Sequence, residues 1–183
     1  NNTQTEVTGK DEYAVTFVNI ENVATIGFLA EEATGNWISV DNFRLYYAGG
    51  DFADFKKELQ RYVETAQGYT SQKMQETVLT QLNACIAAAE AELEKDNADG
   101  YIAISTPLRE AVEAAKASIK AYEALAAAIA AAEADYETGG AEGAEKFLAV
   151  INSAKAVNES LDSSLEEMAA KISELEKATF EFR

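Results

Sequence analysis

Hydrophobic side chains change their spacing near residue 50. Up to that point they alternate with polar residues in short runs, which is the period of β-strands. From Asp51 onward they recur every three or four residues, as on one face of an α-helix, and turn residues fall between the periodic segments. The pattern predicts a mainly α protein with a small N-terminal β part. We place the boundary between residues 1–50 and 51–183.

The N-terminal part contains three short runs that predict strands, at residues 16–18, 25–29 and 36–47. Gly35 lies between the second and third runs, where a hairpin turn needs a residue that tolerates positive φ. The alternation of the third run slips by one residue at Asp41, which a β-bulge would accommodate. These runs predict a partial antiparallel sheet. One face of the third strand would show Trp37, Ser39, Arg44 and Tyr46.

The first two predicted helices are separated by a turn near Gly68. The first begins at Asp51, an N-cap residue, and ends at Gly68. The second begins after Ser71 and ends at a breaker, residues 96–100. Each helix carries one apolar stripe, so each buries a single side. The stripes consist of Phe55, Leu59, Tyr62 and Val63 in the first helix and of Val78, Leu82, Cys85, Ile86, Ala89 and Leu93 in the second.

A proline marks the predicted start of the third helix. Thr106 is a good N-cap, and Pro107 then takes the first helical position, where its missing N–H does no harm. Apolar positions repeat without a break from there to Gly139. The pattern predicts one helix of about 30 residues, roughly 45 Å long at 1.5 Å per residue.

The fourth helix follows Gly143, and the fifth has apolar residues at alternating steps of four and three, which is typical of a bundle seam. If that seam is buried, Leu165→Ala or Ile172→Ala should cost roughly 2–5 kcal/mol of unfolding free energy. Together the five helices predict an up-down bundle. The inward positions are Phe147, Ile151 and Ala154 in the fourth helix and Leu161, Leu165, Met168, Ile172 and Leu175 in the fifth.

The helical part also contains a sequence repeat. Residues 86–91, Ile-Ala-Ala-Ala-Glu-Ala, recur unchanged as residues 129–134, which predicts an internal repeat over about 78–134 and 121–180. Chance alignment of alanine-rich helices is the alternative explanation. If the repeat is a true duplication, the long third helix closes one three-helix unit and opens the next. The bundle would then be a rod of two overlapping three-helix units.

The charge is strongly negative in both parts. The chain has 32 Asp and Glu against 15 Lys and Arg, for a net charge of −17, and residues 1–50 carry seven acidic and two basic side chains. The resulting field repels phosphate backbones and anionic membrane surfaces. No apolar run reaches the roughly 18 residues of a membrane span. We therefore expect no nucleic-acid binding, no membrane span, and a monomer kept in solution by its acidic helix surfaces.

The absence of histidine narrows the chemistry further. It excludes Ser-His-Asp and Cys-His nucleophiles and the HExxH type of zinc site. Phosphate-binding glycine loops and nucleophile elbows are also missing from the sequence. The single cysteine, Cys85, has no partner for an intramolecular disulfide, and we interpret it as a small buried hydrophobe. These observations predict a protein that is not an enzyme and has no cofactor.

Two acidic features are interpreted as ordinary surface. Residues 96–99 precede Gly100 in a way similar to a calcium loop, but the acidic spacing is wrong and no glutamate follows at the required position. We therefore predict no metal site. Carboxylate pairs such as Glu90 with Glu94 lie opposite the apolar stripes, where water keeps both ionised. A glycosidase that uses such a pair is the weakest of the functional alternatives.

Two segments resemble known families. Residues 35–47, Gly-Asn-Trp-Ile-Ser-Val-Asp-Asn-Phe-Arg-Leu-Tyr-Tyr, look like the closing strand of a galactose-binding-like jelly roll, in which Asp-Asn and alternating apolar residues end the sandwich. A complete jelly roll has about eight strands, so the likeness covers the end of that domain. Residues 147–178, with Ala-Lys-Ala-Val at 154–157 and the stripe from Leu161 to Leu175, resemble the three-helix FIVAR-type repeats of bacterial surface proteins.

The resemblances imply a location and a setting. FIVAR-type repeats act as spacers, adhesion modules or sugar-binding accessories beside carbohydrate-active domains. Their combination with a jelly roll implies a secreted or surface-anchored protein of gut-dwelling bacteria, whose partner is a glycan or a host or bacterial surface protein. The chain begins without an initiator methionine or a signal peptide, and we interpret it as a fragment or a processed form.

Two functions remain in consideration. The leading one is a non-catalytic structural or interaction module that spaces and presents neighbouring domains of a larger exported protein. The alternative is a carbohydrate-binding accessory that uses the β face or a groove between helices. The candidate ligand-binding residues on the β face are Trp37, Arg44 and Tyr46, because aromatic rings stack on sugars and arginine donates a planar fork. Alternatively this face packs on the first helix, and an unpaired sheet edge within residues 1–50 invites strand exchange.

Overall fold

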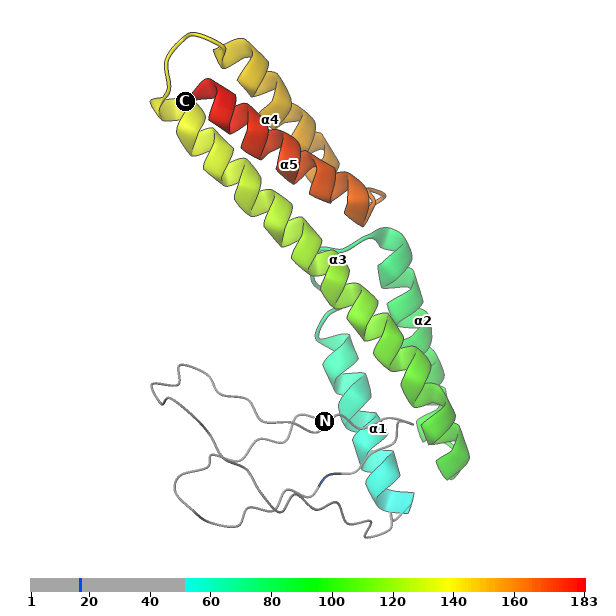
Figure 1. Ribbon diagram of the computed structural model, residues 1–183. Helices are drawn as coiled ribbons and strands as arrows, with labels where there is room; N and C mark the ends of the chain where they lie inside the picture. The colour runs from blue at the N-terminus through cyan, green and yellow to red at the C-terminus, as the bar shows by residue number, and fades with distance from the viewer. Residues whose placement is uncertain (1–16, 18–51) are drawn as a thin grey trace, which may run out of the picture.

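The computed structural model describes Phe17 and residues 52–183 (Figure 1). The predicted strands and the helix cap at Asp51 lie outside the described residues. The described part contains five helices and no strand, which confirms the prediction of five helices after residue 50. The helices are α1 (Phe52–Gln67), α2 (Glu76–Leu93), α3 (Ala98–Thr138), α4 (Ala144–Glu159) and α5 (Leu165–Phe182).

One helix runs through the whole described assembly. α3 has 41 residues, which is about 62 Å at 1.5 Å per residue. α1 and α2 pack on its N-terminal half and α4 and α5 on its C-terminal half (Figure 1). Within the described part, neither α1 nor α2 contacts α4 or α5 through helix-to-helix packing. Residues 52–183 therefore form a rod of two three-helix bundles that share α3.

Each bundle has its own hydrophobic core. The first core contains residues of α1, α2 and the N-terminal half of α3, together with Met74, and the second contains residues of the other half of α3, α4 and α5. Small alanines such as Ala115 and Ala154 are fully buried, which lets neighbouring helices approach closely. Cys85 is buried in the first core, which confirms its interpretation as a small buried hydrophobe.

The two bundles bury matching positions. Leu59, Val63 and Ala66 of α1 lie 66 residues before Leu125, Ile129 and Ala132 of α3, and all six are buried. At an offset of 65 residues, the buried Leu82, Ile86 and Ala89 of α2 match the buried Phe147, Ile151 and Ala154 of α4. At an offset of 67 residues, the buried Tyr101 and Leu108 of α3 match the buried Met168 and Leu175 of α5.

The predicted sequence repeat pairs other positions. It aligns Ile86 with Ile129, and these residues lie in the second helix of one bundle and the first helix of the other. The packing provides no test of common origin, so the repeat over residues 78–134 and 121–180 stays a prediction.

The start of α3 differs from the prediction. The helix begins at Ala98, with Asn97 as N-cap, and Pro107 lies in its interior. A proline there removes one helical hydrogen bond, normally at a cost of about 3 kcal/mol. The extra two turns bury Tyr101 completely, and its ring lies 5.4 Å from that of Phe52. The N-cap predicted at Thr106 is wrong, because burial in the first core outweighs the local preference.

The start of α5 also differs from the prediction. Ser164 is the N-cap, and its hydroxyl accepts a 3.1 Å hydrogen bond from the backbone N–H of Glu167. Leu161 precedes the helix and is 44% exposed, and Leu165 in its first turn is 42% exposed. The buried seam begins one turn later, at Met168. The large cost expected for Leu165→Ala is therefore wrong.

The start of α2 also differs from the prediction: the helix begins at Glu76, several residues after Ser71, and residues 98–100 of the predicted breaker belong to α3. Other helix boundaries follow the sequence pattern. α1 ends just before Gly68, and α4 follows Gly143, whose φ of +75° is in the region that favours glycine. Phe147, Ile151 and Ala154 are buried as predicted. No helix in residues 52–183 has the length and apolarity needed to cross a membrane.

Candidate functional site

The predicted ligand-binding residues Trp37, Arg44 and Tyr46 lie outside the described residues. Their assignment therefore stays a prediction. Three aromatic residues of α1, the helix on which the β face would alternatively pack, are partly buried against the first core. They are Phe52, Phe55 and Tyr62.

The most elaborate polar arrangement in the described part lies halfway along α3, where the two bundles meet. The α1–α2 connection, residues 68–75, comes next to the α4–α5 connection, residues 160–164. The backbone N–H of Glu76 donates to the carbonyl of Leu161 at 3.0 Å. The side-chain amide of Gln75 donates to the carbonyl of Ser163 at 2.9 Å. These bonds join one bundle to the other directly.

α3 supplies two side chains to the same arrangement. The hydroxyl of Ser118 accepts from the backbone N–H of Gln75 at 2.9 Å, and the hydroxyl of Tyr122 donates to the carbonyl of Ser160 at 2.6 Å. Residues four apart lie on the same face of a helix, so both point toward the connections. We call this set the clasp: Gln75, the backbone N–H of Glu76, Ser118, Tyr122 and the backbone of residues 160–163.

The clasp is buried on the side of α3 and exposed on the side of the connections. Ser118 has no exposed surface, and Tyr122 is 2% exposed. Ser163 is also buried, and its hydroxyl donates to the carbonyl of Val157 at 2.8 Å. Gln75 is half-buried, and Glu76, Ser160 and Leu161 are exposed. Breaking a bond on the buried side leaves an unpaired group at a cost in free energy.

The protonation of Tyr122 suits its role as a donor. Burial raises the pKa of Tyr122 above the ordinary value of a phenol, and the carboxylate of Asp162 raises that pKa further. The ammonium group of Lys73 lies 5.0 Å from the centroid of the ring. Such a cation over an aromatic face is attracted by the ring electrons. The phenol therefore keeps its proton at neutral pH, which its bond to Ser160 requires.

A groove of about 320 Å³ opens beside the clasp. The side-chain oxygen of Asn158 in this groove is buried and has no hydrogen-bond partner. Tyr122 contributes little accessible ring surface, because it is 2% exposed and Lys73 covers one face. The groove is lined by Gln72, Lys73, Ile119, Tyr122, Glu123, Ala126 and Asn158.

The acidic residues singled out in the sequence make ordinary contacts. Asp96 forms an exposed ion pair with Lys56 at 3.5 Å, and Asn97 donates to Glu92 at 3.3 Å. Residues 52–183 contain no group of three or more acidic or cysteine side chains that would hold a metal ion. The carboxylates of Glu90 and Glu94 are exposed, as their position opposite the apolar stripe predicts.

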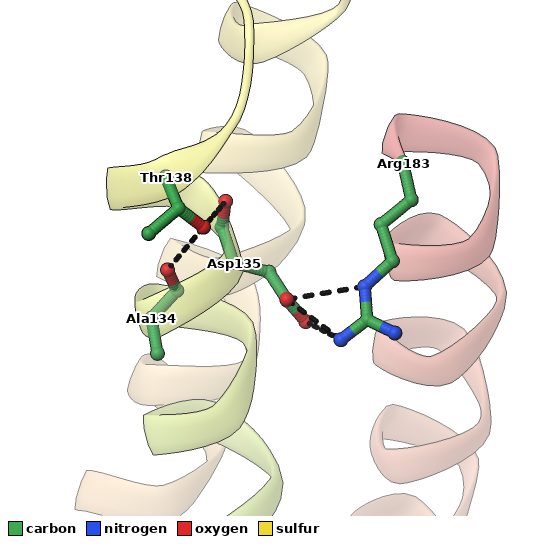
Figure 2. A network of polar contacts seen from close by, with 4 residues as sticks. All are labelled: Ala134, Asp135, Thr138 and Arg183. Carbon is green, nitrogen blue, oxygen red and sulfur yellow. Dashed lines mark hydrogen bonds and ion pairs between the residues drawn. The ribbon is translucent and has the colours of Figure 1, made fainter.

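The far end of the second bundle is closed by aromatic packing and an ion pair. The rings of Phe147 and Phe182 lie 4.6 Å apart, and Tyr136 stacks on Phe182 at 6.2 Å. The guanidinium of Arg183 binds both carboxylate oxygens of Asp135, with its Nη2 atom at 2.7 and 2.8 Å (Figure 2). These contacts fasten the end of α5 to the end of α3.

No family model matches this chain, and neither a curated protein nor a solved structure matches it. The likeness to jelly-roll domains and FIVAR-type repeats therefore rests on the sequence segments quoted above. The functional argument below rests on the geometry of residues 52–183.

The clasp was not predicted from the sequence. Tyr122 is one of the apolar positions that repeat between Pro107 and Gly139, and that pattern assigns no partner to its hydroxyl. A usable signal was Ser118, a polar residue three positions after Ala115 and four before Tyr122 in that pattern. Gln75 carried no signal, because glutamine in a connection between helices is common.

Proposed function

We propose that this chain is a non-catalytic spacer that holds neighbouring domains of a larger exported bacterial surface protein apart. The observation that carries the proposal is the sharing of α3 by two cores, which extends the helical part along one axis. A helix that is packed on both halves resists bending more than a flexible linker of the same number of residues. The acidic surface keeps such a rod from associating with itself.

Small-angle X-ray scattering tests the extended shape. A compact chain of 183 residues has a radius of gyration of about 16 Å. We expect a clearly larger radius, and a maximum dimension of at least about 62 Å, the length of α3. A radius near the compact value would contradict the spacer.

A replacement experiment tests the role itself. Residues 52–183 would be exchanged, within the exported protein, for an unrelated helical rod of equal length or for a Gly/Ser linker of equal residue number. We expect the rod to preserve the activity of the exported protein and the flexible linker to lose it. Loss with both replacements would show that the surface of this chain binds a partner.

Carbohydrate binding is the second candidate function. The groove beside the clasp supports it, because the polar side chains of Gln72, Lys73 and Glu123 line it and can form hydrogen bonds with sugar hydroxyls. A glycan array would compare the intact chain with a chain that begins at Asp51. Binding lost with residues 1–50 would assign it to Trp37, Arg44 and Tyr46. Binding kept by both chains and lost in Gln72→Ala would assign it to the groove.

A further inference from the structure

We propose that the clasp locks the two bundles into one rigid body, so that the stiffness of the rod depends on two loops as well as on α3. The inference rests on the proposed spacer function for its biological meaning. Its physical content is that the clasp fixes the orientation of α4 and α5 relative to α1 and α2.

Few contacts other than the shared α3 cross the junction between the bundles. Within the described part, the helices of one bundle make no packing contact with the helices of the other, apart from the shared α3. A single helix bends gently along its length and kinks where its hydrogen bonds are disturbed. If α3 were the only connection, the two bundles could therefore bend and twist relative to each other. The contacts between the connections at residues 68–75 and 160–164 oppose this motion.

Gln75 is the central residue of the clasp. Its backbone N–H is held by Ser118 of α3, and its side-chain amide reaches Ser163 in the α4–α5 connection. One residue thus ties the shared helix and a loop of the second bundle to a loop of the first. Tyr122, which lies in the second core, holds the α4–α5 connection in place through its bond to Ser160. A change of angle between the bundles stretches the two bonds that cross the junction, from Gln75 to Ser163 and from Glu76 to Leu161.

The clasp is specific to this junction. In the second bundle the corresponding connection between the first two helices is residues 139–143, at the far end of the rod. That connection is Gly-Gly-Ala-Glu-Gly, and all five residues are exposed. A turn between helices of this bundle type therefore does not require a bridging glutamine. The side-chain bond of Gln75 to Ser163 is explained by the contact between the two bundles.

A distance measurement in the full-length chain tests the clasp. Spin labels would be attached to Ala91→Cys in α2 and Ala149→Cys in α4, which are exposed positions in different bundles. Cys85, the single native cysteine, would be replaced by alanine so that only these positions react. Pulsed electron paramagnetic resonance then reports the distribution of distances between the labels. We expect one narrow distribution for the chain with an intact clasp.

The clasp would be opened on its side-chain half by Gln75→Ala combined with Tyr122→Phe, which leaves the backbone bond from Glu76 to Leu161 in place. We expect loss of the single narrow distribution, while the helical content measured by circular dichroism is unchanged. The matched control is Gln67→Ala with Tyr101→Phe. It removes the same chemical groups, whose bonds to Glu90 and to the carbonyl of Lys95 lie within the first bundle. The control should keep the narrow distribution.

The outcomes separate the two proposals. A narrow distribution in both the intact and the opened clasp would overturn the clasp and leave the spacer in place. A broad distribution in the intact chain would overturn the rigid spacer itself. A broader distance distribution in the control variant as well would show that the loss of any hydrogen bond loosens the rod. That result would also overturn the proposal that the clasp locks the two bundles. If the double variant loses helical content, Gln75→Ala alone supplies the comparison, because its side chain makes a bond that crosses between the bundles.

Discussion

At the scale of single residues, burial decides what each leucine contributes to stability. Leu125 lies in the second core and has no exposed surface, whereas Leu165 is 42% exposed at the start of α5. Both residues are helical, so the change to alanine has a similar effect on helix propensity at each position. The difference between them therefore measures packing.

We expect Leu125→Ala to lower the free energy of unfolding by about 2–5 kcal/mol, because it leaves a cavity in the core. Leu165→Ala should cost less than about 1 kcal/mol, as is usual for a surface position. Urea unfolding followed by circular dichroism measures both. Equal costs for the two variants would contradict the assignment of the second core.

Tyr122 gives the clasp a dependence on alkaline pH. The raised pKa means that the folded state holds the phenol proton more tightly than the unfolded state does. The contribution of the protonated Tyr122 to the free energy of unfolding is therefore fully present below about pH 10, the pKa of an unperturbed tyrosine. It is lost as pH rises through the pKa of Tyr122 in the folded state. Ionisation also removes the proton that bonds to Ser160.

The expected result is a fall in stability above about pH 10 that is steeper in the unsubstituted chain than in Tyr122→Phe. The chain has eight tyrosines, so the difference between the two proteins carries the information, and not either profile alone. Urea unfolding at several pH values between 8 and about 11 would provide it. Parallel profiles would show that Tyr122 does not contribute.

At the scale of elements, α3 illustrates how packing extends a helix beyond its local signals. Pro107 is exposed and interior, and the hydroxyl of the nearby Ser105 donates to the carbonyl of Ile102 at 2.8 Å. The two turns before the proline are retained because they bury Tyr101 and Ser105 completely. α3 thus contains a proline that is unfavourable in a helix interior, because the longer helix makes a longer contact with α1 and α2.

Pro107→Ala tests this account. The substitution restores a backbone N–H in the helix interior, and we expect it to raise the free energy of unfolding by about 1–3 kcal/mol. Thr106→Ala is the companion variant, and it should change stability little. If Thr106 were an N-cap, its replacement would instead cost about 1 kcal/mol. Thermal and urea unfolding of both variants would distinguish the two descriptions.

At the scale of the whole molecule, the excess of acidic side chains acts against the compact state. The net charge of −17 is spread over both parts of the chain, and the ion pairs of the helical part are mostly exposed. Exposed pairs contribute little to stability. Repulsion between like charges is therefore the larger electrostatic effect, and it also keeps rods apart in solution.

Salt should consequently stabilise the protein. Raising the ionic strength from about 0.01 M to 0.15 M shortens the Debye length from about 30 Å to 8 Å, which screens the long-range repulsion. We expect the melting temperature to rise over this range in differential scanning calorimetry. An uncharged osmolyte at equal osmolarity is the control. A melting temperature that falls with salt would show that the ion pairs outweigh the repulsion.

The sequence by itself determined the helical period after residue 50, the number of helices, and the boundaries marked by glycine, such as the end of α1 and the start of α4. These features follow from local rules, such as the positive φ at Gly143 and the apolar spacing around Phe147 and Ile151. The tertiary structure alone decided the start of α3, the exposure of Leu165 and the clasp. Each of these depends on contacts between segments distant in the chain, as between Gln75 and Ser163. The spacing of apolar residues predicts which side of a helix is buried. It does not predict where the neighbouring helix ends, and therefore not which residues at a helix end are covered.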